Sequence, residues 1–250
     1  MALDPIHQFE IHSLVPLFKV GSADVSVTNS AIFMLIAVGL TALLLIGATA
    51  GRRLVPTRMQ SMAELSYELV ASTLRNTAGE EGMKFFPFVF SLFMFILVSN
   101  VVGLIPYAFT VTSHIVITAA LALTVFFTVI IYGLLKNGLH FFNLFLPRGI
   151  PIWMAPMIIV IELLSFLARP ISHSVRLFAN ILAGHITLKL VAGFIVMMGS
   201  AGLLGWFGAI APLALTIALT ALELLVAVLQ AYVFTILTCI YLNDAIHPGH

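Results

Sequence analysis

Long apolar stretches alternate with short polar connections along the chain of 250 residues. Three apolar stretches, at about 30–50, 85–108 and 114–135, have the length of a helix that crosses about 30 Å of hydrocarbon. Two more, at about 151–198 and 208–242, are too long for one upright crossing. A helix of about 48 residues measures about 70 Å, so each long stretch tilts strongly, kinks, or forms two spans. The pattern predicts an all-α integral membrane protein with about five transmembrane helices.

Two connecting segments have patterns of their own. Apolar residues recur at helical spacing within the otherwise polar segment 57–82, which is typical of an amphipathic helix on a membrane surface. Ser61 and Glu64 are a candidate capping pair within it. The segment 138–151 is aromatic and broken by Pro and Gly, so we expect an interfacial turn. The segment 1–28 lacks the basic start and apolar core of a cleaved signal, and we expect it to be retained.

The distribution of basic residues predicts the orientation. With five spans, seven Lys and Arg residues fall in the connections 51–84 and 136–150, and the other side has Lys19 alone. The positive-inside rule therefore places these connections and the C-terminus in the cytoplasm and the segment 1–28 outside. A sixth span would make 169–180 an external loop and put two arginines on the outer side, so we prefer five spans.

Glycines between 199 and 208 then mark an external hairpin between the last two spans. The composition agrees with a membrane protein: 61% of the residues are hydrophobic and 8% are charged, whereas soluble domains have about a quarter charged residues. The net charge of +1 offers no basic surface for nucleic acid. Cys239, the single cysteine, excludes an intramolecular disulfide and a multi-cysteine metal site. The sequence has no nucleotide, dinucleotide or zinc-protease motif, so we expect no cofactor.

A run of polar residues, RPISHSVRLFANILAGH from Arg169 to His185, lies within the fourth apolar stretch. Ionisable side chains at membrane depth are costly and mark functional sites. At about 100° per residue, six polar side chains share an arc of about 100° on one helix face. They are Glu162, Arg169, Ser172, His173, Arg176 and Asn180. One wall of this helix is therefore expected to be wet or to face a polar partner.

Other polar residues lie on a second helix and on the far side of the first. His185 and Lys189 fall opposite Arg176, where they face another helix or an aqueous cavity. The last apolar stretch has a second polar stripe, within about 40°, whose members are Thr216, Glu223, Gln230 and Tyr241. Two such stripes facing each other would form a proton path through Glu223, His185 and Gln230.

Arg176 keeps its charge at any physiological pH, so it cannot pass protons along a chain. At mid-membrane it needs an anion, and the candidates within the chain are Glu162 and Glu223. Glu162 is about 21 Å away along the same helix, too far for an ion pair. A carboxylate on another protein is the alternative, and Arg176 would drive the proton off it. A fixed cation between two polar pockets also stops protons from passing directly between them.

Most of these residues also have a purely structural explanation, and Arg176 has the weakest one because nothing local neutralises it. The structural alternatives are a snorkelling carboxylate for Glu162, packing for His173 and His185, a link between helices for Asn100, snorkelling for Arg169 and Lys189, and an interfacial anchor for Tyr241.

The run from Arg169 to Asn180, followed by Ala183-Gly184-His185, resembles subunit a of the rotary F-type ATP synthase, the stator channel of its membrane sector. Supporting matches are the segment 99–106, SNVVGLIP, and the pair Glu223 and Gln230. The resemblance covers most of the chain from about 85 onward, and the arginine run is highly specific. It implies that 151–242 forms a pair of long, strongly tilted, channel-forming helices.

The resemblance also implies roles for individual residues. Arg176 matches the essential arginine that meets the carboxylates of a rotating ring of subunit c. Residues that match the external half-channel are Asn180, His185, Glu223 and Gln230, and those that match the cytoplasmic one are Glu162, Ser172 and His173. Asn100 is a further candidate for the proton path. Many bacterial members have an acid at the position of His185 and a histidine at that of Glu223, so which group is the working relay stays open.

A member of this family has no catalytic activity of its own, because ATP is made on partner subunits. The implied partners are the ring of subunit c, the peripheral-stalk subunit b and the lipid bilayer of a bacterial inner membrane, with protons as the only substrate. A secondary transporter is the alternative, but internal repeats and paired broken helices are not visible. A metal-dependent hydrolase would need His173 and His185 on one ion, although they lie about 120° apart on one helix.

Overall fold

The computed structural model describes residues 11–20, 23–50, 55–105, 108–145, 154–200 and 202–248. Within them, five helices are long and apolar enough to cross a membrane, which confirms the predicted class. The elements are β1 (Ser13–Val20), β2 (Ala23–Thr28), α1 (Asn29–Ala50), α2 (Arg58–Gly82), η2 (Met83–Phe85), α3 (Phe86–Gly103), η3 (Val111–Ser113), α4 (Ile115–Asn137), η4 (Gly138–Phe145), α5 (Ala155–Gly199) and α6 (Leu203–Ile246).

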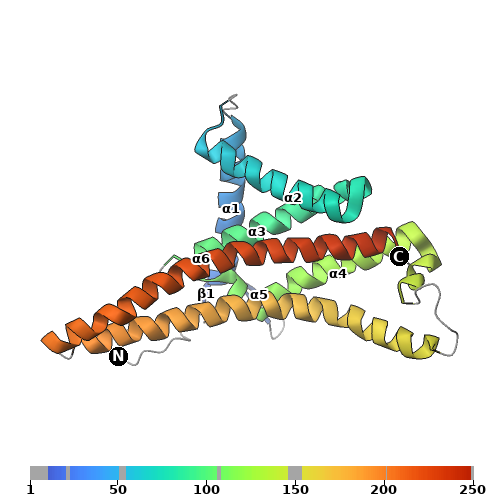
Figure 1. Ribbon diagram of the computed structural model, residues 1–250. Coiled ribbons are helices and arrows are strands. Elements are labelled where there is room, and N and C mark those ends of the chain that lie inside the picture. Colours follow the sequence, from blue (N-terminus) through green and yellow to red (C-terminus); the bar gives the residue numbers. More distant parts are fainter. Residues whose placement is uncertain are drawn as a thin grey trace.

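The two long apolar stretches are each one continuous helix. α5 has 45 residues and continues through Pro170, and α6 has 44 residues. This rules out the six-span alternative, which required a loop at 169–180. A helix of this length measures about 67 Å, more than twice the hydrocarbon thickness of a bilayer. In Figure 1, α5 and α6 run lengthwise and steeply inclined to α1, as helices of that length must if they stay in the membrane.

α2 is the predicted amphipathic helix, and it lies across the end of α1 in Figure 1. Its N-cap is Thr57, whose side chain accepts a hydrogen bond from the Gln60 backbone N–H. The predicted capping pair of Ser61 and Glu64 is therefore wrong: the Glu64 carboxylate accepts from the Gln60 side-chain amide at 2.8 Å instead. Gly79, with φ of 67°, bends the chain toward α3, a conformation that side chains with a Cβ adopt rarely.

The segment before α1 contains a two-stranded antiparallel sheet that we did not predict. β1 pairs with β2 in a register that sets Ser13 opposite Thr28 and Val20 opposite Ala23. The signal was present, because two short runs that contain valines are separated by Gly-Ser, a pair typical of a hairpin turn. The described part of the expected external hairpin is also tighter than predicted, since Gly205 and Gly208 belong to α6 and only Gly202 caps it, with φ of 88°.

The core lies where α2, α3, α4 and α6 meet. Leu74, Phe93, Ile96, Val129 and Phe234 are among its fully or almost fully buried side chains. In contrast, α1, α5 and α6 expose many large apolar side chains, which is the pattern of helices that face lipid or other apolar helices. η4 returns against this bundle: a Cβ on Gly133 would lie 2.4 Å from the Phe141 ring, so only glycine allows this packing.

Candidate functional site

Some side chains of the polar stripe of α5 are buried against α6, and others are exposed beside that contact. Ser172, Arg176 and Asn180 are exposed, whereas His173 is 3% exposed and packs edge-on against Phe234, with ring centroids 3.8 Å apart. The pattern predicted a wall that is wet or faces a polar partner; in the structure part of this face is exposed, and part is buried against α6. An arc of about 100° is wide enough to cover both the helix contact and the open surface beside it.

Arg176 lies near the middle of α5, with its side chain on the open surface. The ion pairs within the described ranges do not include it. Both acids considered as its partners contact other groups, since Glu162 approaches Arg169 and Glu223 approaches His185. The guanidinium is thus available to an anion from outside the chain.

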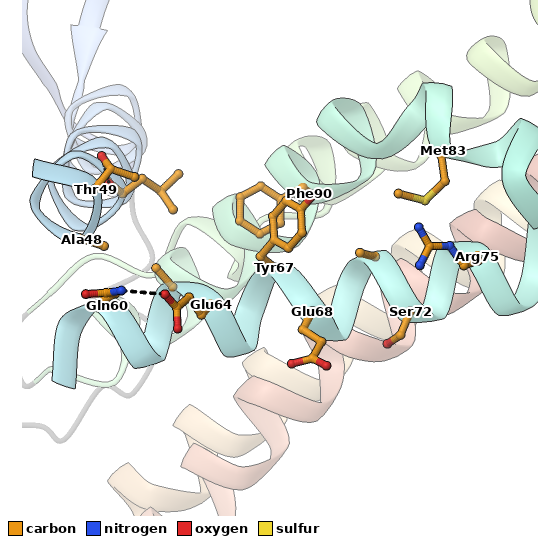
Figure 2. A pocket seen from close by; sticks show the side chains of 13 residues that line it. Ala48, Thr49, Gln60, Glu64, Tyr67, Glu68, Ser72, Arg75, Met83 and Phe90 are labelled. Carbon is orange, nitrogen blue, oxygen red and sulfur yellow. Dashed lines mark hydrogen bonds between the residues drawn. The ribbon is translucent and has the colours of Figure 1, made fainter. Parts of the chain in front are cut away.

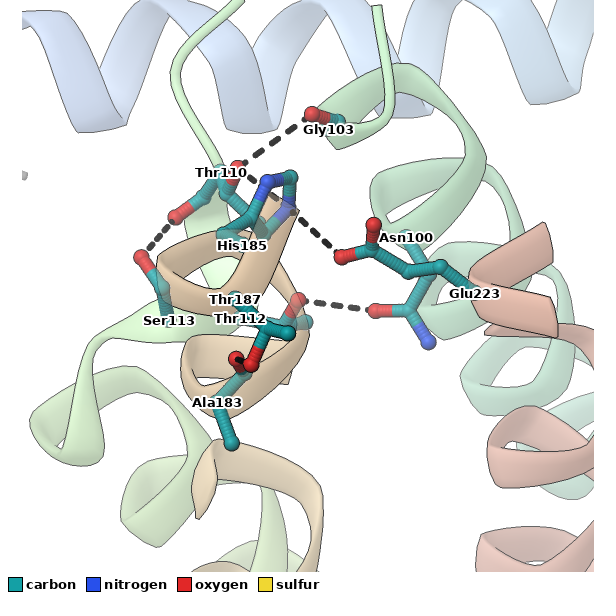
Figure 3. A network of polar contacts seen from close by, with 9 residues as sticks. All are labelled: Asn100, Gly103, Thr110, Thr112, Ser113, Ala183, His185, Thr187 and Glu223. Carbon is teal, nitrogen blue, oxygen red and sulfur yellow. Dashed lines mark hydrogen bonds and ion pairs between the residues drawn. The ribbon is translucent and has the colours of Figure 1, made fainter. Parts of the chain in front are cut away.

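On one side of Arg176, the structure brings His185 and Glu223 together, as the stripes predicted (Figure 3). The His185 Nε2 atom lies 3.8 Å from the Glu223 Oε1 atom and 3.2 Å from the Thr110 hydroxyl. Glu223 is 5% exposed, and its carboxylate oxygens have no hydrogen-bond partner in the described structure. The two atoms lie just beyond hydrogen-bond distance, so a small movement of the flexible Glu223 side chain would let the acid and the imidazole exchange a proton directly.

Thr110 belongs to a buried polar segment that the sequence reasoning missed. Residues 110–114 lie around η3 between α3 and α4, and Thr110, Thr112 and Ser113 are almost fully buried. The Thr112 hydroxyl donates to Asn100 Oδ1 at 2.7 Å, and Asn100 Nδ2 donates to the Ala227 carbonyl at 3.2 Å. Asn100 therefore links α3 to α6 and to η3. The run TVTSH between two apolar stretches was the available signal.

His114 closes this segment at the start of α4. Its ring stacks on Phe109 with 4.9 Å between centroids, and its Nε2 atom has no hydrogen-bond partner in the described structure. Burial lowers the pKa of the His114 imidazole below its ordinary value, since the charged form is poorly solvated there. The ring is therefore neutral at neutral pH, and its Nε2 atom can form a hydrogen bond with a water molecule.

A pocket of about 210 Å³ between α5 and α6 reaches this network, and its lining includes Asn180, Gly184 and Glu223. Asn180 Nδ2 donates to Gln230 Oε1 at 3.2 Å, so these two amides extend the network toward Arg176. Gly184 makes room for the acid, because a Cβ there would lie 2.7 Å from Glu223 Oε1.

On the other side of Arg176, a second polar cluster surrounds Arg169. Its guanidinium donates to Asp244 Oδ2 at 2.6 Å and lies 3.9 Å from Glu162 Oε1. It also lies over the rings of Phe166 and Tyr241, at 5.4 and 5.1 Å. Arg169 and Tyr241 thus contact each other in one cluster, and neither is the isolated snorkelling or anchoring residue of the structural alternatives.

Asp244 is a further residue that the sequence reasoning missed. It follows Gln230 by fourteen residues, which places it within about 40° of that side chain on one helix face. The neighbouring pocket, lined by Arg169, His173 and Tyr241 among others, has a volume of about 10 Å³, which is room for about one water molecule. Two separate polar sites therefore flank Arg176, one on each side.

Comparison with known proteins gives one consistent result. The family described as ATP synthase A chain matches residues 31–243. The chain is 65% identical to ATP synthase subunit a of Nitrobacter winogradskyi over 99% of its length and all of the relative's. Its identity is 64% to the subunit a of Rhodopseudomonas palustris strain TIE-1 and 63% to that of Bradyrhizobium diazoefficiens, over the full length of each chain. The chain belongs to the ATP synthase subunit a family.

Membership of this family decides the class of function. The chain is a proton-channel stator subunit of a membrane-embedded ATP synthase and not a catalytic subunit. The alternative of a secondary transporter has no support in these comparisons. A bacterial inner membrane is the location that fits both the relatives and the five apolar helices.

The face of the molecule away from the polar stripe of α5 has a pocket of its own. A pocket of about 660 Å³ lies between α1, α2 and α3 (Figure 2). Ala48, Tyr67 and Phe90 give it apolar walls, and Glu64 and Glu68 are exposed at its rim. This face is made by elements other than α5.

Proposed function

We propose that the two polar sites are half-channels, offset along α5 on either side of Arg176. The external half-channel consists of Glu223, His185, Gln230 and Asn180, with Asn100 assigned to the same path through Thr112. The cytoplasmic half-channel consists of Glu162, Ser172 and His173. The contacts between α5 and α6 support this division, because Asn180 and Glu223 line one pocket and His173 lines a separate one.

The observation that carries the proposal is the exposed guanidinium of Arg176, which has no acidic partner in the described part of the chain. A carboxylate that arrives from a moving partner is held there in its ionised form. Once a proton from the external half-channel neutralises that carboxylate, it leaves Arg176 and enters lipid, where a charged group is too costly. After nearly a full turn it loses the proton to the cytoplasmic half-channel.

The proposed partner on this face is a ring of subunit c. The exposed residues beside Arg176 on α5 include four small ones, namely Ala168, Ser172, Ala179 and Ala183. Small residues let another helix approach the backbone closely, so the ring carboxylates come within reach of the guanidinium. The membrane potential drives the exchange, since one charge that crosses 100 mV releases about 2.3 kcal/mol.

The proposed partner on the opposite face is the peripheral-stalk subunit b, a static component that has to bind away from the ring. The pocket between α1, α2 and α3 offers an apolar surface with Glu64 and Glu68 at its rim (Figure 2). In this arrangement residues 1–250 form one membrane domain. The segment 1–28 is outside, 57–82 is an interfacial helix at the cytoplasmic surface, and 151–242 is the channel-forming pair.

Replacement of Arg176 tests the proposal. We expect Arg176→Ala, in the complete ATP synthase reconstituted in vesicles, to abolish ATP-driven proton pumping, because nothing then holds the ring carboxylate ionised. Passive proton leak through the ring interface accompanies the loss, since the barrier between the half-channels is gone. The readouts are acidification of the vesicle lumen and decay of an imposed pH gradient.

Arg58→Ala is the matched control, because Arg58 is an exposed arginine at the start of α2 and outside the proposed channel. It should pump at the wild-type rate. Coupled pumping at an unchanged rate in Arg176→Ala, with the complex assembled, would refute the proposed mechanism.

A further inference from the structure

Three charged side chains meet at the end of α5 that precedes Arg176. Arg169 stands between two acids, with Asp244 of α6 at 2.6 Å and Glu162 of α5 at 3.9 Å. The side chains of Arg169, Asp244 and Glu162 are 19%, 26% and 32% exposed, so water reaches them only in part. Tyr241 lies under the guanidinium, and His173 faces the Tyr241 ring.

The cluster has one cation and two carboxylates. Ion pairs within the described ranges give neither acid another Lys or Arg partner. With both acids ionised, the cluster has a net charge of −1 in a partly desolvated site. Uptake of one proton would make the cluster neutral, and either Asp244 or Glu162 could bind that proton.

The two distances decide which acid takes it. Asp244 accepts a short, charge-assisted hydrogen bond from Arg169, and protonation of Asp244 would sacrifice that bond. Glu162 lies within reach of the charge but accepts no hydrogen bond from Arg169. Protonation of Glu162 therefore loses only a weaker, longer-range attraction.

We propose that Asp244 is a positioning residue that occupies the guanidinium of Arg169 and thereby leaves Glu162 free to take up and release protons. This inference rests on the proposed function, which assigns Glu162 to the cytoplasmic half-channel. In this role Asp244 acts through Arg169, with which it shares a hydrogen bond.

The arrangement makes an unusual prediction for Asp244→Asn. The amide oxygen can still accept a hydrogen bond but has no negative charge, so the guanidinium of Arg169 turns to Glu162 as its remaining acid and holds it ionised. An opposite charge at contact distance changes the protonation equilibrium of an acid by about tenfold or more. We expect proton pumping and ATP synthesis to fall by at least about tenfold, because the proton has to reside on Glu162 in both directions.

Removal of the cation should then restore function. In the double variant Arg169→Gln with Asp244→Asn, the cation that holds Glu162 ionised is absent. We expect this variant to pump protons at about half of the wild-type rate or faster. Asp244→Glu keeps a carboxylate that can pair with Arg169, and its pumping rate should stay within about twofold of the wild-type rate. A purely mechanical link between α5 and α6 predicts the opposite for the double variant, because that variant has lost both partners of the link.

The measurement is ATP-driven pumping and passive proton conduction by the complete ATP synthase in vesicles, normalised to the amount of assembled complex. Glu81→Gln is the matched control, because it removes a carboxylate from an ion pair with Lys136 elsewhere on the chain. If Asp244→Asn alone fails to assemble, the double variant and Asp244→Glu still decide, since a positioning role requires both to work.

The outcomes separate this inference from the proposed function. Normal pumping in Asp244→Asn, or a double variant as impaired as the single one, overturns the positioning role and leaves the half-channels untouched. Wild-type pumping in Glu162→Gln overturns the assignment of Glu162 itself. Loss in Glu162→Gln together with rescue in the double variant supports both.

Discussion

At the scale of single residues, the missing side chain of Gly184 sets the geometry of the external polar network. α5 approaches α6 closely enough there that a Cβ would lie 2.7 Å from Glu223 Oε1. That same oxygen is the one that lies 3.8 Å from His185. The distance between the buried acid and the imidazole therefore depends on a residue that carries no chemistry.

We expect Gly184→Ala to impair proton pumping without destabilising the helix. The Glu223 carboxylate is the flexible end of a side chain and can move aside, and alanine favours a helix over glycine by about 0.5–1 kcal/mol. A displacement near 1 Å at a reacting group can cost up to about a hundredfold in rate, so a loss of about tenfold or more is predicted. The rate and the thermal stability of the purified complex are to be measured together.

Gly39→Ala is the control for that variant, because a Cβ on Gly39 of α1 would meet nothing within 4 Å. It should leave the pumping rate unchanged. A Gly184→Ala complex that pumps normally would mean that the position of Glu223 does not limit proton entry.

The sequence could predict contacts between polar side chains only from the helix face on which each residue lies. Phase placed Glu223 and His185 on faces able to meet, and they do. It could not show that Arg169 pairs with Asp244, since that contact joins residues 75 positions apart and depends on how far α6 slides along α5. The acid was overlooked because it follows the last clear apolar stretch.

At the scale of elements, η3 is a short segment that gains its fixed place from neighbouring helices. Its side chains are buried although they are polar, and Asn100 of α3 supplies the acceptor for Thr112. Apolar runs and charges predicted the helix ends within a few residues, but hydropathy has no way to distinguish a buried polar turn from an exposed one. The unpredicted β1–β2 pair has the same cause, since pairing between strands is a tertiary contact.

We expect Asn100→Leu to loosen the packing of η3, because the hydrogen bond between Thr112 and Asn100 is lost. The substitution leaves the buried Thr112 hydroxyl without an acceptor, and an unsatisfied buried group costs about 1–3 kcal/mol. The thermal midpoint of the purified complex should fall, and the pumping rate with it, because Thr110 then no longer holds its place beside His185.

Thr124→Val on α4 is the comparison variant, because that exposed hydroxyl bonds only to its own helix, at the Ala120 carbonyl. It should change the free energy of unfolding by less than about 0.5 kcal/mol, and therefore leave the thermal midpoint almost unchanged. Equal midpoints for the two variants would show that Asn100 does not support η3.

At the scale of the whole molecule, the inclined pair of α5 and α6 and the upright α1 must share one bilayer, which fixes the side on which each connection lies. The positive-inside rule predicts the orientation, with the connections 51–84 and 136–150 in the cytoplasm. We expect the Glu80→Cys variant to react with a membrane-impermeant maleimide from the cytoplasmic side, and the Ser13→Cys variant to react from outside.

Both positions are exposed, whereas the native Cys239 is fully buried and should stay unlabelled. Labelling of intact cells against inverted vesicles gives the measurement. Reaction of the cysteine at Glu80 in intact cells would invert the proposed orientation and exchange the two half-channels.

The core that joins α2, α3, α4 and α6 has a mechanical consequence. One face of the molecule is proposed to feel the sideways push of a turning rotor, and the other to be tied to a fixed stalk. Torque therefore passes through the packed side chains between them, such as Leu74 and Phe234. Close packing makes that region stiff. A substitution that opens a cavity there would let the subunit deform under load, and part of the energy released by each proton would go into that deformation and not into rotation.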